Sequence, residues 1–183
     1  MIHVITGGSG SGKSEYAESR VLAAGEGHRV YIATMIPYGT EGSARVARHR
    51  RLRREKQFGT VERYTDLAGL SVEPGSIVLL ECVSNLVANE VFEPCGAHER
   101  AVDAVVAGIR KLGSQARELF VVTNEVFSDG VTYDVETERY LSYLGEVNCR
   151  LAAMADSVTE VVYGIPVRLA GRTDAGENSG MTV

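Results

Sequence analysis

The stretch "IHVITGGSGSGKS", residues 2–14, decides the fold of this chain. Five residues typical of a buried strand stop at a glycine-rich loop, and Lys13 and Ser14 follow the loop where a helical pattern begins. The spacing Gly7-x-x-x-x-Gly12-Lys13-Ser14 fits the Walker A pattern, in which a strand, a loop and a helix surround the phosphates of a nucleotide. We therefore expect a P-loop at this end of the chain.

Each residue type in this loop has a physical role toward phosphate. Glycines let backbone N–H groups turn inward around phosphate oxygens, and the following helix adds the positive end of its dipole. Lys13 supplies a positive charge for the β- and γ-phosphates, and the Ser14 hydroxyl can bind Mg²⁺. The sequence therefore predicts a triphosphate site with Mg²⁺ as cofactor, formed by Gly7, Gly8, Ser9, Gly10, Ser11, Gly12, Lys13 and Ser14.

Strand-like and helical stretches alternate along the rest of the chain. The expected strands are rich in Val, Ile and Leu and span 2–6, 29–33, 77–81, 119–123 and 158–163. The expected helices span 13–24, 41–56, 82–92, 98–112 and 135–154. This alternation predicts an α/β fold, a three-layer P-loop NTPase-like domain with a mostly parallel sheet. Such sheets bind their ligands beyond the carboxyl ends of the strands.

The length of 183 residues suits one domain. We expect residues 1–170 to form a single catalytic domain, and residues 171–183, rich in Gly, Asp, Asn, Ser and Thr, to form a flexible tail. The net charge of −5 argues against nucleic acid as a partner. Because no apolar stretch could span a membrane, no signal-peptide pattern is visible and the three scattered cysteines predict free thiols, we expect a cytoplasmic protein.

Two further stretches bring carboxylates to the ends of buried strands. "SIVLLE" ends in Glu81, and "LFVVTNE" ends in Asn124 and Glu125. P-loop proteins usually bring a carboxylate to the metal from the end of another strand. Glu81 is therefore the main candidate to hold Mg²⁺ together with Ser14. The alternative is that either glutamate only caps the helix that follows it.

Residues 45–56 contain seven Lys or Arg residues and one Glu, in an otherwise acidic chain. At helical spacing, Arg45, His49 and Arg53 share a face. Neighbouring cations disfavour the imidazolium, so His49 is expected to be neutral and able to attack phosphorus, beside arginines that can bind phosphate oxygens. Three alternatives stay open: a solvated helix face, a basic patch for nucleic acid, and phosphate binding by the arginines without covalent catalysis.

Several stretches, taken in order, resemble one family. They are "TGGSGSGKS" at 6–14, "YIATM" at 31–35, "RVARHRRLR" at 45–53, "TVE" at 60–62, "LLECVSNLVANEVF" at 79–92, "VVTNEV" at 121–126 and "GEVNCRLAAMADSV" at 145–158. Together they resemble the bifunctional adenosylcobinamide kinase / adenosylcobinamide-phosphate guanylyltransferase family of cobalamin biosynthesis, as far as Val167.

The resemblance implies two reactions on a corrinoid. ATP or GTP phosphorylates the aminopropanol hydroxyl of adenosylcobinamide, and GTP then donates GMP through a histidine to adenosylcobinamide phosphate, which gives adenosylcobinamide-GDP. The guanylylated histidine corresponds to His49, and Lys13 is the second catalytic residue. Further nucleotide contacts are implied at Thr34, Met35, Ile36, Arg50, Arg51, Leu52, Arg53, Glu62 and Glu81. The family also implies a homo-oligomer, specifically a trimer, with active sites near subunit contacts.

Two other functions stay open beside this one. The first is a P-loop small-molecule kinase without the guanylyltransferase half. The second is a nucleotide-dependent binding module whose arginine helix meets an acidic or nucleic-acid partner. Label from GTP retained on the protein without corrinoid distinguishes the bifunctional enzyme from the first, and salt-dependent binding to RNA or DNA would favour the second.

Overall fold

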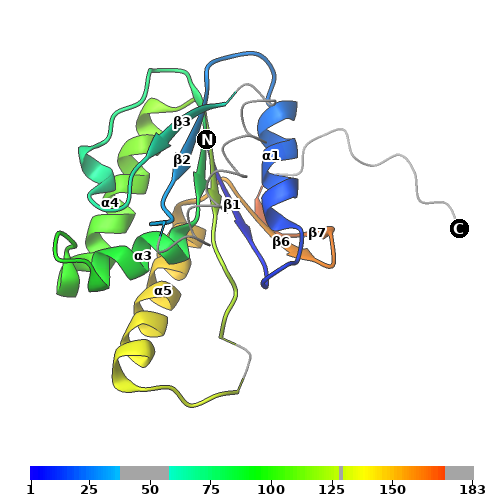
Figure 1. Cartoon of the computed structure of the whole chain (residues 1–183). Helices are drawn as coiled ribbons and strands as arrows, with labels where there is room; N and C mark the ends of the chain where they lie inside the picture. The colour runs from blue at the N-terminus through cyan, green and yellow to red at the C-terminus, as the bar shows by residue number, and fades with distance from the viewer. Residues whose placement is uncertain (38–57, 128–129, 172–183) are drawn as a thin grey trace, which may run out of the picture.

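The centre of the molecule is a seven-stranded sheet, seen in a computed structural model that describes residues 1–37, 58–127 and 130–171 (Figure 1). The strands lie in the order β3-β2-β4-β5-β1-β6-β7. All neighbouring strands pair in parallel except β6 and β7. The strands span Ile2–Thr6 (β1), Arg29–Ala33 (β2), Gly59–Glu62 (β3), Ile77–Glu81 (β4), Glu118–Val122 (β5), Ser157–Val162 (β6) and Ile165–Gly171 (β7).

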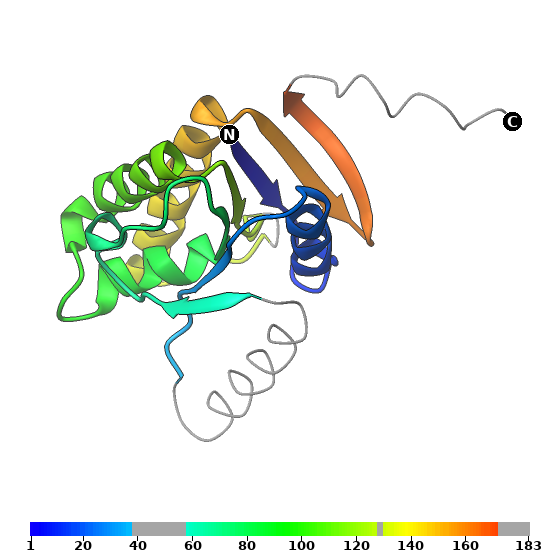
Figure 2. The same ribbon diagram turned by 90° about the horizontal axis from the view of Figure 1, so that it is seen from above.

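Helices cover both faces of the sheet. One face carries α1 (Lys13–Ala23), and the other carries α3 (Val83–Phe92), α4 (Ala101–Gln115) and α5 (Val135–Met154) (Figure 2). Two short 3-10 turns are η1 (Leu67–Gly69) and η2 (His98–Arg100). No helix in the described part of the chain is long and apolar enough to cross a membrane.

Each face of the sheet has its own apolar core, because successive strand residues point to opposite faces. The core on the α1 side includes Ile5, Tyr31, Leu79, Phe120 and Val122. The larger core, under α3, α4 and α5, includes Val4, Ile32, Leu80, Leu119 and Val121. Each fully buried aliphatic side chain of this kind contributes about 1.5–3 kcal/mol, so both faces stabilise the sheet on which the site is built.

The strand order brings separate parts of the sequence to one edge of the sheet. β5 lies between β1 and β4, and the three strands run in parallel. Their carboxyl ends therefore meet at the lower edge of the sheet in Figure 1. The glycine loop follows β1 at this edge, where parallel sheets bind their ligands.

The expected three-layer α/β fold is confirmed, and the five predicted strands all occur, with bounds that agree to one residue. β3 and β7 are not predicted by the sequence. β3 is short, lies at the edge and is mostly exposed, and β7 is exposed along its whole length, so neither shows a buried apolar run. The helix predicted over 41–56 lies outside the described residues. β7 ends at Gly171, the first residue of the expected tail, and residues 172–183 are also outside them.

Candidate active site

The loop between β1 and α1 turns sharply at two of its glycines. Gly7 has a φ of 151° and Gly12 a φ of 90°, values that residues with side chains rarely adopt. A Cβ atom at Gly7 would lie 2.5 Å from the carbonyl oxygen of Val161, and one at Gly12 would lie 3.3 Å from Cα of Gly164. The Gly164 N–H also donates to the Ser11 carbonyl oxygen (2.8 Å), so the β6–β7 turn supports the loop directly.

Lys13 places its positive charge at this loop. It is the first residue of α1 and only 9% exposed. Its Nζ atom donates to the Gly8 carbonyl oxygen (2.9 Å), so the ammonium group folds back over the glycines. The N-terminus of α1 adds the positive end of the helix dipole at the same place. The loop therefore combines the features that favour binding of a triphosphate.

Three side chains from three elements form a hydrogen-bonded cluster beside the loop. Ser14 on α1 donates to Oε1 of Glu81 at the end of β4 (2.5 Å), and Tyr31 on β2 donates to Oε2 of the same carboxylate (2.5 Å). Ser14 and Glu81, both predicted from the sequence, are 67 residues apart along the chain. The parallel strand order is what brings them together.

Tyr31 is a candidate functional residue that the sequence patterns did not single out. It is 5% exposed, and Phe58 packs edge-on against its ring with the centroids 6.0 Å apart. Tyr31 lies opposite Leu79 in the β2–β4 pairing, so it shares a sheet face with Glu81, two residues further along. The available signal was a tyrosine inside a buried strand, since a buried phenol requires a hydrogen-bond partner.

Glu62 also lies at the carboxyl end of a strand, but apart from this cluster. Ala33 pairs with Glu81 on one side and with Glu62 on the other, so β2 separates the two carboxylates. Glu62 is exposed at the end of the edge strand β3 and accepts a hydrogen bond from the Tyr64 hydroxyl (3.0 Å). Its role as a nucleotide contact stays a prediction.

Thr34 holds the end of β4 in place. It is fully buried, and its hydroxyl donates to the Cys82 carbonyl oxygen (2.8 Å) and accepts from the Cys82 N–H (2.7 Å). The Asn89 side-chain amide donates to the Thr34 carbonyl oxygen (2.8 Å). Met35 and Ile36 follow and are half-buried. The Thr34 side chain therefore positions the strand end that carries Glu81, and contacts from 34–36 to a nucleotide remain predicted.

The end of β5 carries the second acidic candidate. The Glu125 N–H donates to the Gly7 carbonyl oxygen (3.2 Å), so the backbone runs beside the phosphate loop. The Glu125 carboxylate, however, accepts from the Phe127 N–H (3.0 Å), and the Asn124 amide donates to the Ser84 hydroxyl (2.6 Å). Neither contact involves Ser14, so the geometry favours Glu81 as the acid that works with the loop.

Tyr140 on α5 lies behind this strand end and ties α5 to the start of α3. Burial raises the pKa of its phenol, and the nearby Cys82 raises it further. A hydrogen bond with the Ser84 side chain lowers the pKa. The Tyr140 hydroxyl also donates to the Ser84 carbonyl oxygen (3.4 Å). The phenol therefore stays protonated at neutral pH and acts as a donor.

The three cysteines Cys82, Cys95 and Cys149 are free thiols, as predicted.

The oxygens beside the loop fit Mg²⁺. This ion prefers hard oxygen ligands and, in nucleotide enzymes, binds one or two protein oxygens together with substrate phosphates. The Ser14 hydroxyl and the Glu81 carboxylate supply such oxygens 2.5 Å apart. Among residues 1–37, 58–127 and 130–171, no three His, Cys, Asp or Glu side chains gather as a metal site. An ion bound here would therefore depend on phosphate oxygens for the rest of its ligands.

The strand–loop–helix unit and the acid at the end of β4 place the molecule among the P-loop nucleotide-binding proteins. Within that class, the chain belongs to the family described as cobinamide kinase / cobinamide phosphate guanyltransferase, which it matches over residues 3–169. The resemblance seen in the sequence motifs is thereby confirmed.

Two relatives match nearly the whole chain. The "Bifunctional adenosylcobalamin biosynthesis protein CobU" of Escherichia coli (strain K12) is 34% identical over 184 residues, 92% of this chain and 99% of the relative. The protein with the same description from Salmonella typhimurium (strain LT2) is 33% identical over 187 residues, with the same two coverages of 92% and 99%. These matches confirm the predicted enzyme class, a combined kinase and guanylyltransferase of cobalamin biosynthesis.

Among solved structures, the chain is similar to the flagellar accessory protein FlaH from Methanocaldococcus jannaschii. The TM-score is 0.43 and the sequence identity 12%, over 87% of this chain and 70% of FlaH.

His49 and residues 50–53, which carry the predicted guanylyl transfer, lie within 38–57, outside the described residues.

Proposed function

We propose that this chain phosphorylates the aminopropanol hydroxyl of adenosylcobinamide with a nucleoside triphosphate and then transfers GMP from GTP to the new phosphate. The observation that carries the proposal is the pairing of Ser14 with Glu81 beside the P-loop lysine, in a chain of the cobinamide kinase / cobinamide phosphate guanyltransferase family. The acceptors would be adenosylcobinamide and its phosphate, and the final product would be adenosylcobinamide-GDP.

In the kinase step, the acceptor hydroxyl oxygen attacks the γ-phosphorus while the bond to the β–γ bridging oxygen breaks. The nucleoside diphosphate leaves with the electrons of that bond, and the hydroxyl proton is released to water. The loop N–H groups and Lys13 would bind the β- and γ-phosphates and stabilise the charge on the leaving group. Ser14 and Glu81 would hold Mg²⁺, which neutralises phosphate charge when bound.

In the transferase step, a ring nitrogen of neutral His49 attacks the α-phosphorus of GTP, and pyrophosphate leaves. A phosphate oxygen of the corrinoid then attacks the same phosphorus, and the bond to the imidazole breaks, which restores His49. Residues 50–53 include arginines that would bind the phosphates of GTP. This step is supported by the family and by the sequence at 45–53.

Further parts of the proposal concern contacts and assembly. Residues 34–36 and Glu62 would complete the nucleotide site. Residues 1–170 would act as the catalytic unit. The enzyme would work in the cytoplasm as a homo-oligomer, with a trimer as the form that the sequence resemblance implies.

The variant His49→Ala tests the transferase half. After incubation with GTP labelled at the α-phosphate and no corrinoid, the wild-type protein should carry an acid-labile GMP adduct that mass spectrometry places on His49. The variant should carry none, while its ATP-dependent kinase activity stays measurable. His28→Ala is the control, because His28 is an exposed histidine before β2 that pairs with Glu73 (3.2 Å), and it should label like the wild type.

Two results would count against this reading. Label on the His49→Ala variant would show that the nucleophile lies elsewhere. A wild-type protein that phosphorylates cobinamide but never retains label would favour the single-activity P-loop kinase.

A further inference from the structure

A pocket of about 430 Å³ lies between α5 and the connection that leads to it from β5. One wall is formed by the residues after β5, including Val126, Phe127, Val131 and Tyr133. The other wall is one side of α5, including Leu141, Ser142 and Gly145. Figure 1 shows that the first turns of α5 and this connection extend beyond the carboxyl edge of the sheet, the edge that carries the P-loop.

The segment that leads from β5 into this pocket runs beside the phosphate loop. At the end of β5, the Thr123 N–H donates to the Ile5 carbonyl oxygen (2.9 Å) and the Glu125 N–H to the Gly7 carbonyl oxygen (3.2 Å). Val126 and Phe127, the next two residues, already line the pocket. Two residues span at most about 7 Å, so a molecule bound in the pocket can present a side arm to a phosphate on the loop.

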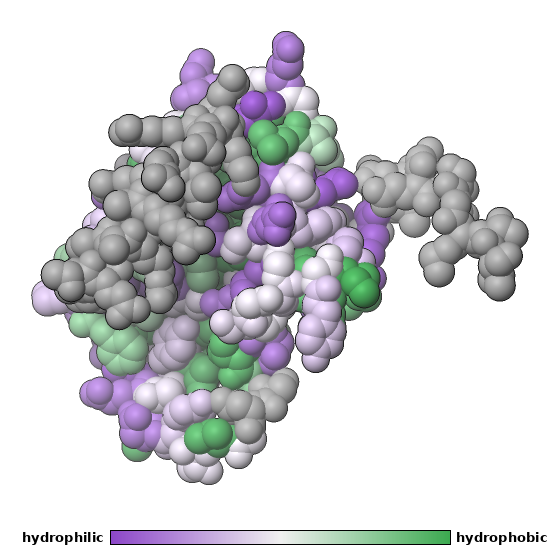
Figure 3. Space-filling view, turned by 45° about the vertical axis from the view of Figure 1, so that its right-hand side comes forward, coloured by the Kyte–Doolittle hydropathy of each residue, from purple (hydrophilic) through white to green (hydrophobic). Residues whose placement is uncertain are grey.

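The pocket gathers large apolar side chains that the core does not use. Phe127 is 44% exposed, Val131 57% and Tyr133 37%. The Phe127 ring lies over Gly145, where a Cβ atom would be 3.8 Å from the ring, so an aromatic surface lies against α5. Figure 3 shows apolar groups among more polar ones at the lower end of the molecule, where these elements lie. Exposed apolar side chains that cluster in this way mark binding sites.

α5 presents two different sides along its length. Its core side is buried and consists of Leu144, Val147 and Leu151. Leu141, Ser142 and Gly145 lie on the pocket side instead. Asp134 caps the helix, and its carboxylate accepts from two N–H groups of the first turn (both 3.0 Å), which hold its pKa below the usual value. The helix is therefore stabilised where it forms the pocket wall beyond the sheet.

We propose that this pocket binds one edge of the corrin ring of the acceptor, with the aminopropanol arm directed to the phosphate loop. The inference rests on the proposed function, because it assigns a subsite to that acceptor. A corrinoid has apolar, methyl-bearing ring surface and amide side chains. These fit a pocket with Phe127 and Leu141 in its walls and with Ser142 and Glu138 as polar groups. The volume lies in the lower part of the range for small-molecule sites, which suits one edge of the ring rather than the whole.

The first test is Phe127→Ala, with Phe92→Ala as its matched control. Phe92 is 47% exposed, close to the 44% of Phe127, but lies at the end of α3 and outside the pocket. We expect the dissociation constant for cobinamide, measured by equilibrium dialysis, to rise about tenfold or more in Phe127→Ala. The KM for ATP and the GMP label formed without corrinoid should stay within twofold of wild type, and Phe92→Ala should match wild type in all three.

A second variant, Ser142→Phe, fills the pocket at an exposed helix position where folding tolerates the change. It should weaken cobinamide binding at least as strongly, with an unchanged melting temperature. Wild-type cobinamide affinity in both pocket variants would overturn the inference. A raised KM for ATP with unchanged cobinamide binding would overturn it as well, because the pocket would then hold the purine base. Failure of the wild type to bind or phosphorylate cobinamide would instead refute the proposed function.

Discussion

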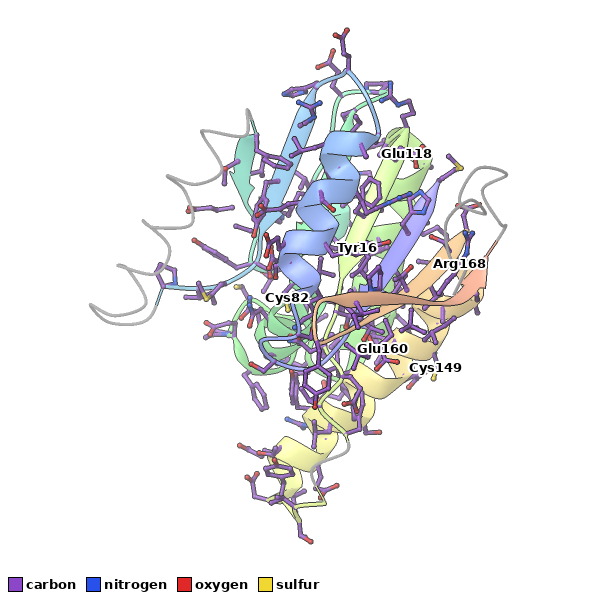
Figure 4. All side chains as sticks on the ribbon, turned by 90° about the vertical axis from the view of Figure 1, so that its right-hand side faces the viewer. Tyr16, Cys82, Glu118, Cys149, Glu160 and Arg168 are labelled. Carbon is purple, nitrogen blue, oxygen red and sulfur yellow. The ribbon has the colours of Figure 1, made fainter. Side chains whose placement is uncertain are left out.

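The two edges of the central sheet each carry a hydrogen-bonded cluster of catalytic residue types, but the glycine loop and the N-terminus of α1 lie at the carboxyl edge. At the amino edge, His3 on β1 lies between Ser157 on β6 (Nδ1 to Oγ, 2.7 Å) and Glu118 on β5 (Nε2 to Oε2, 2.7 Å). By composition this is a serine, a histidine and a carboxylate, the set used by many hydrolases. Figure 4 shows how far apart the edges are, with Glu118 at one and Cys82 at the other.

The difference between the edges lies in what surrounds each cluster. At the amino edge, His3 pairs with Ser157 and Phe120 in the strand registers, and its ring stacks on Phe120 with the centroids 4.9 Å apart. Its two ring nitrogens are both used to join three adjacent strands. At the carboxyl edge, the Ser14–Glu81 pair lies beside a glycine loop and a helix N-terminus. Residue types alone therefore do not make a site, and the position on the parallel sheet decides.

Lys13→Ala should have the largest effect on activity, because it removes the positive charge at the loop. We expect ATP-dependent phosphorylation of cobinamide to fall on the order of 10²–10³-fold, with little change in melting temperature. Lys111→Ala is the matched control, since the Lys111 ammonium also donates to a backbone carbonyl, that of Ala68 (2.7 Å), but on α4. Turnover of Lys13→Ala within a few-fold of wild type would overturn the assignment of the loop.

Tyr31→Phe should have an intermediate effect that depends on Mg²⁺. The substitution keeps the ring packed against Phe58 but removes one of the two hydroxyls that orient the Glu81 carboxylate. We expect the dissociation constant for ATP to rise about tenfold in the presence of Mg²⁺, the size of one hydrogen bond to a charged group. In EDTA it should stay near the wild-type value.

The control for this prediction is Tyr16→Phe. It removes a tyrosine hydroxyl beside the same apolar cluster and leaves the hydrogen bond from Tyr31 to Glu81 in place. Equal losses of ATP affinity with and without Mg²⁺ in Tyr31→Phe would show that the Tyr31 hydroxyl does not act through a metal ion held by Glu81. That result would make the carboxyl-edge cluster structural, like the one at the amino edge.

Most of the carboxyl edge can be predicted from the sequence because its signals are local. The loop at 7–14 has fixed spacing, and Glu81 directly ends a buried apolar run. The fold class also follows, since the buried parallel strands read as continuous apolar stretches. The same pattern does not predict β7, because this strand is exposed throughout and contains Pro166 and Arg168.

The contacts that are missed depend on strand order and register, which no single stretch of sequence specifies. The bond from Tyr31 to Glu81 requires β2 beside β4 with Tyr31 opposite Leu79. The His3 cluster similarly requires β1 to lie between β5 and β6. The pocket between α5 and the connection from β5 depends on how far α5 extends beyond the sheet. Periodicity predicts a helix at 135–154, but it does not predict where this helix lies relative to the sheet.

His3→Phe should have the smallest effect on activity and act on stability instead. The phenyl ring can keep the stacking on Phe120, but it leaves the Ser157 hydroxyl and the Glu118 carboxylate without their shared partner. Loss of a partner for partly buried polar groups costs about 1–3 kcal/mol, which should lower the melting temperature by several degrees. Glu118→Gln keeps an oxygen that can accept a hydrogen bond from the imidazole, so its melting temperature should fall by less than that of His3→Phe.

Kinase turnover at 25 °C should be unchanged in both amino-edge variants, since neither side chain reaches the loop. A fall in turnover comparable to that of Lys13→Ala, with the melting temperature preserved, would contradict the distinction between the edges. It would mean that the amino-edge cluster takes part in the reaction, and that the position of a cluster on a parallel sheet is a weaker guide to function than its residue types.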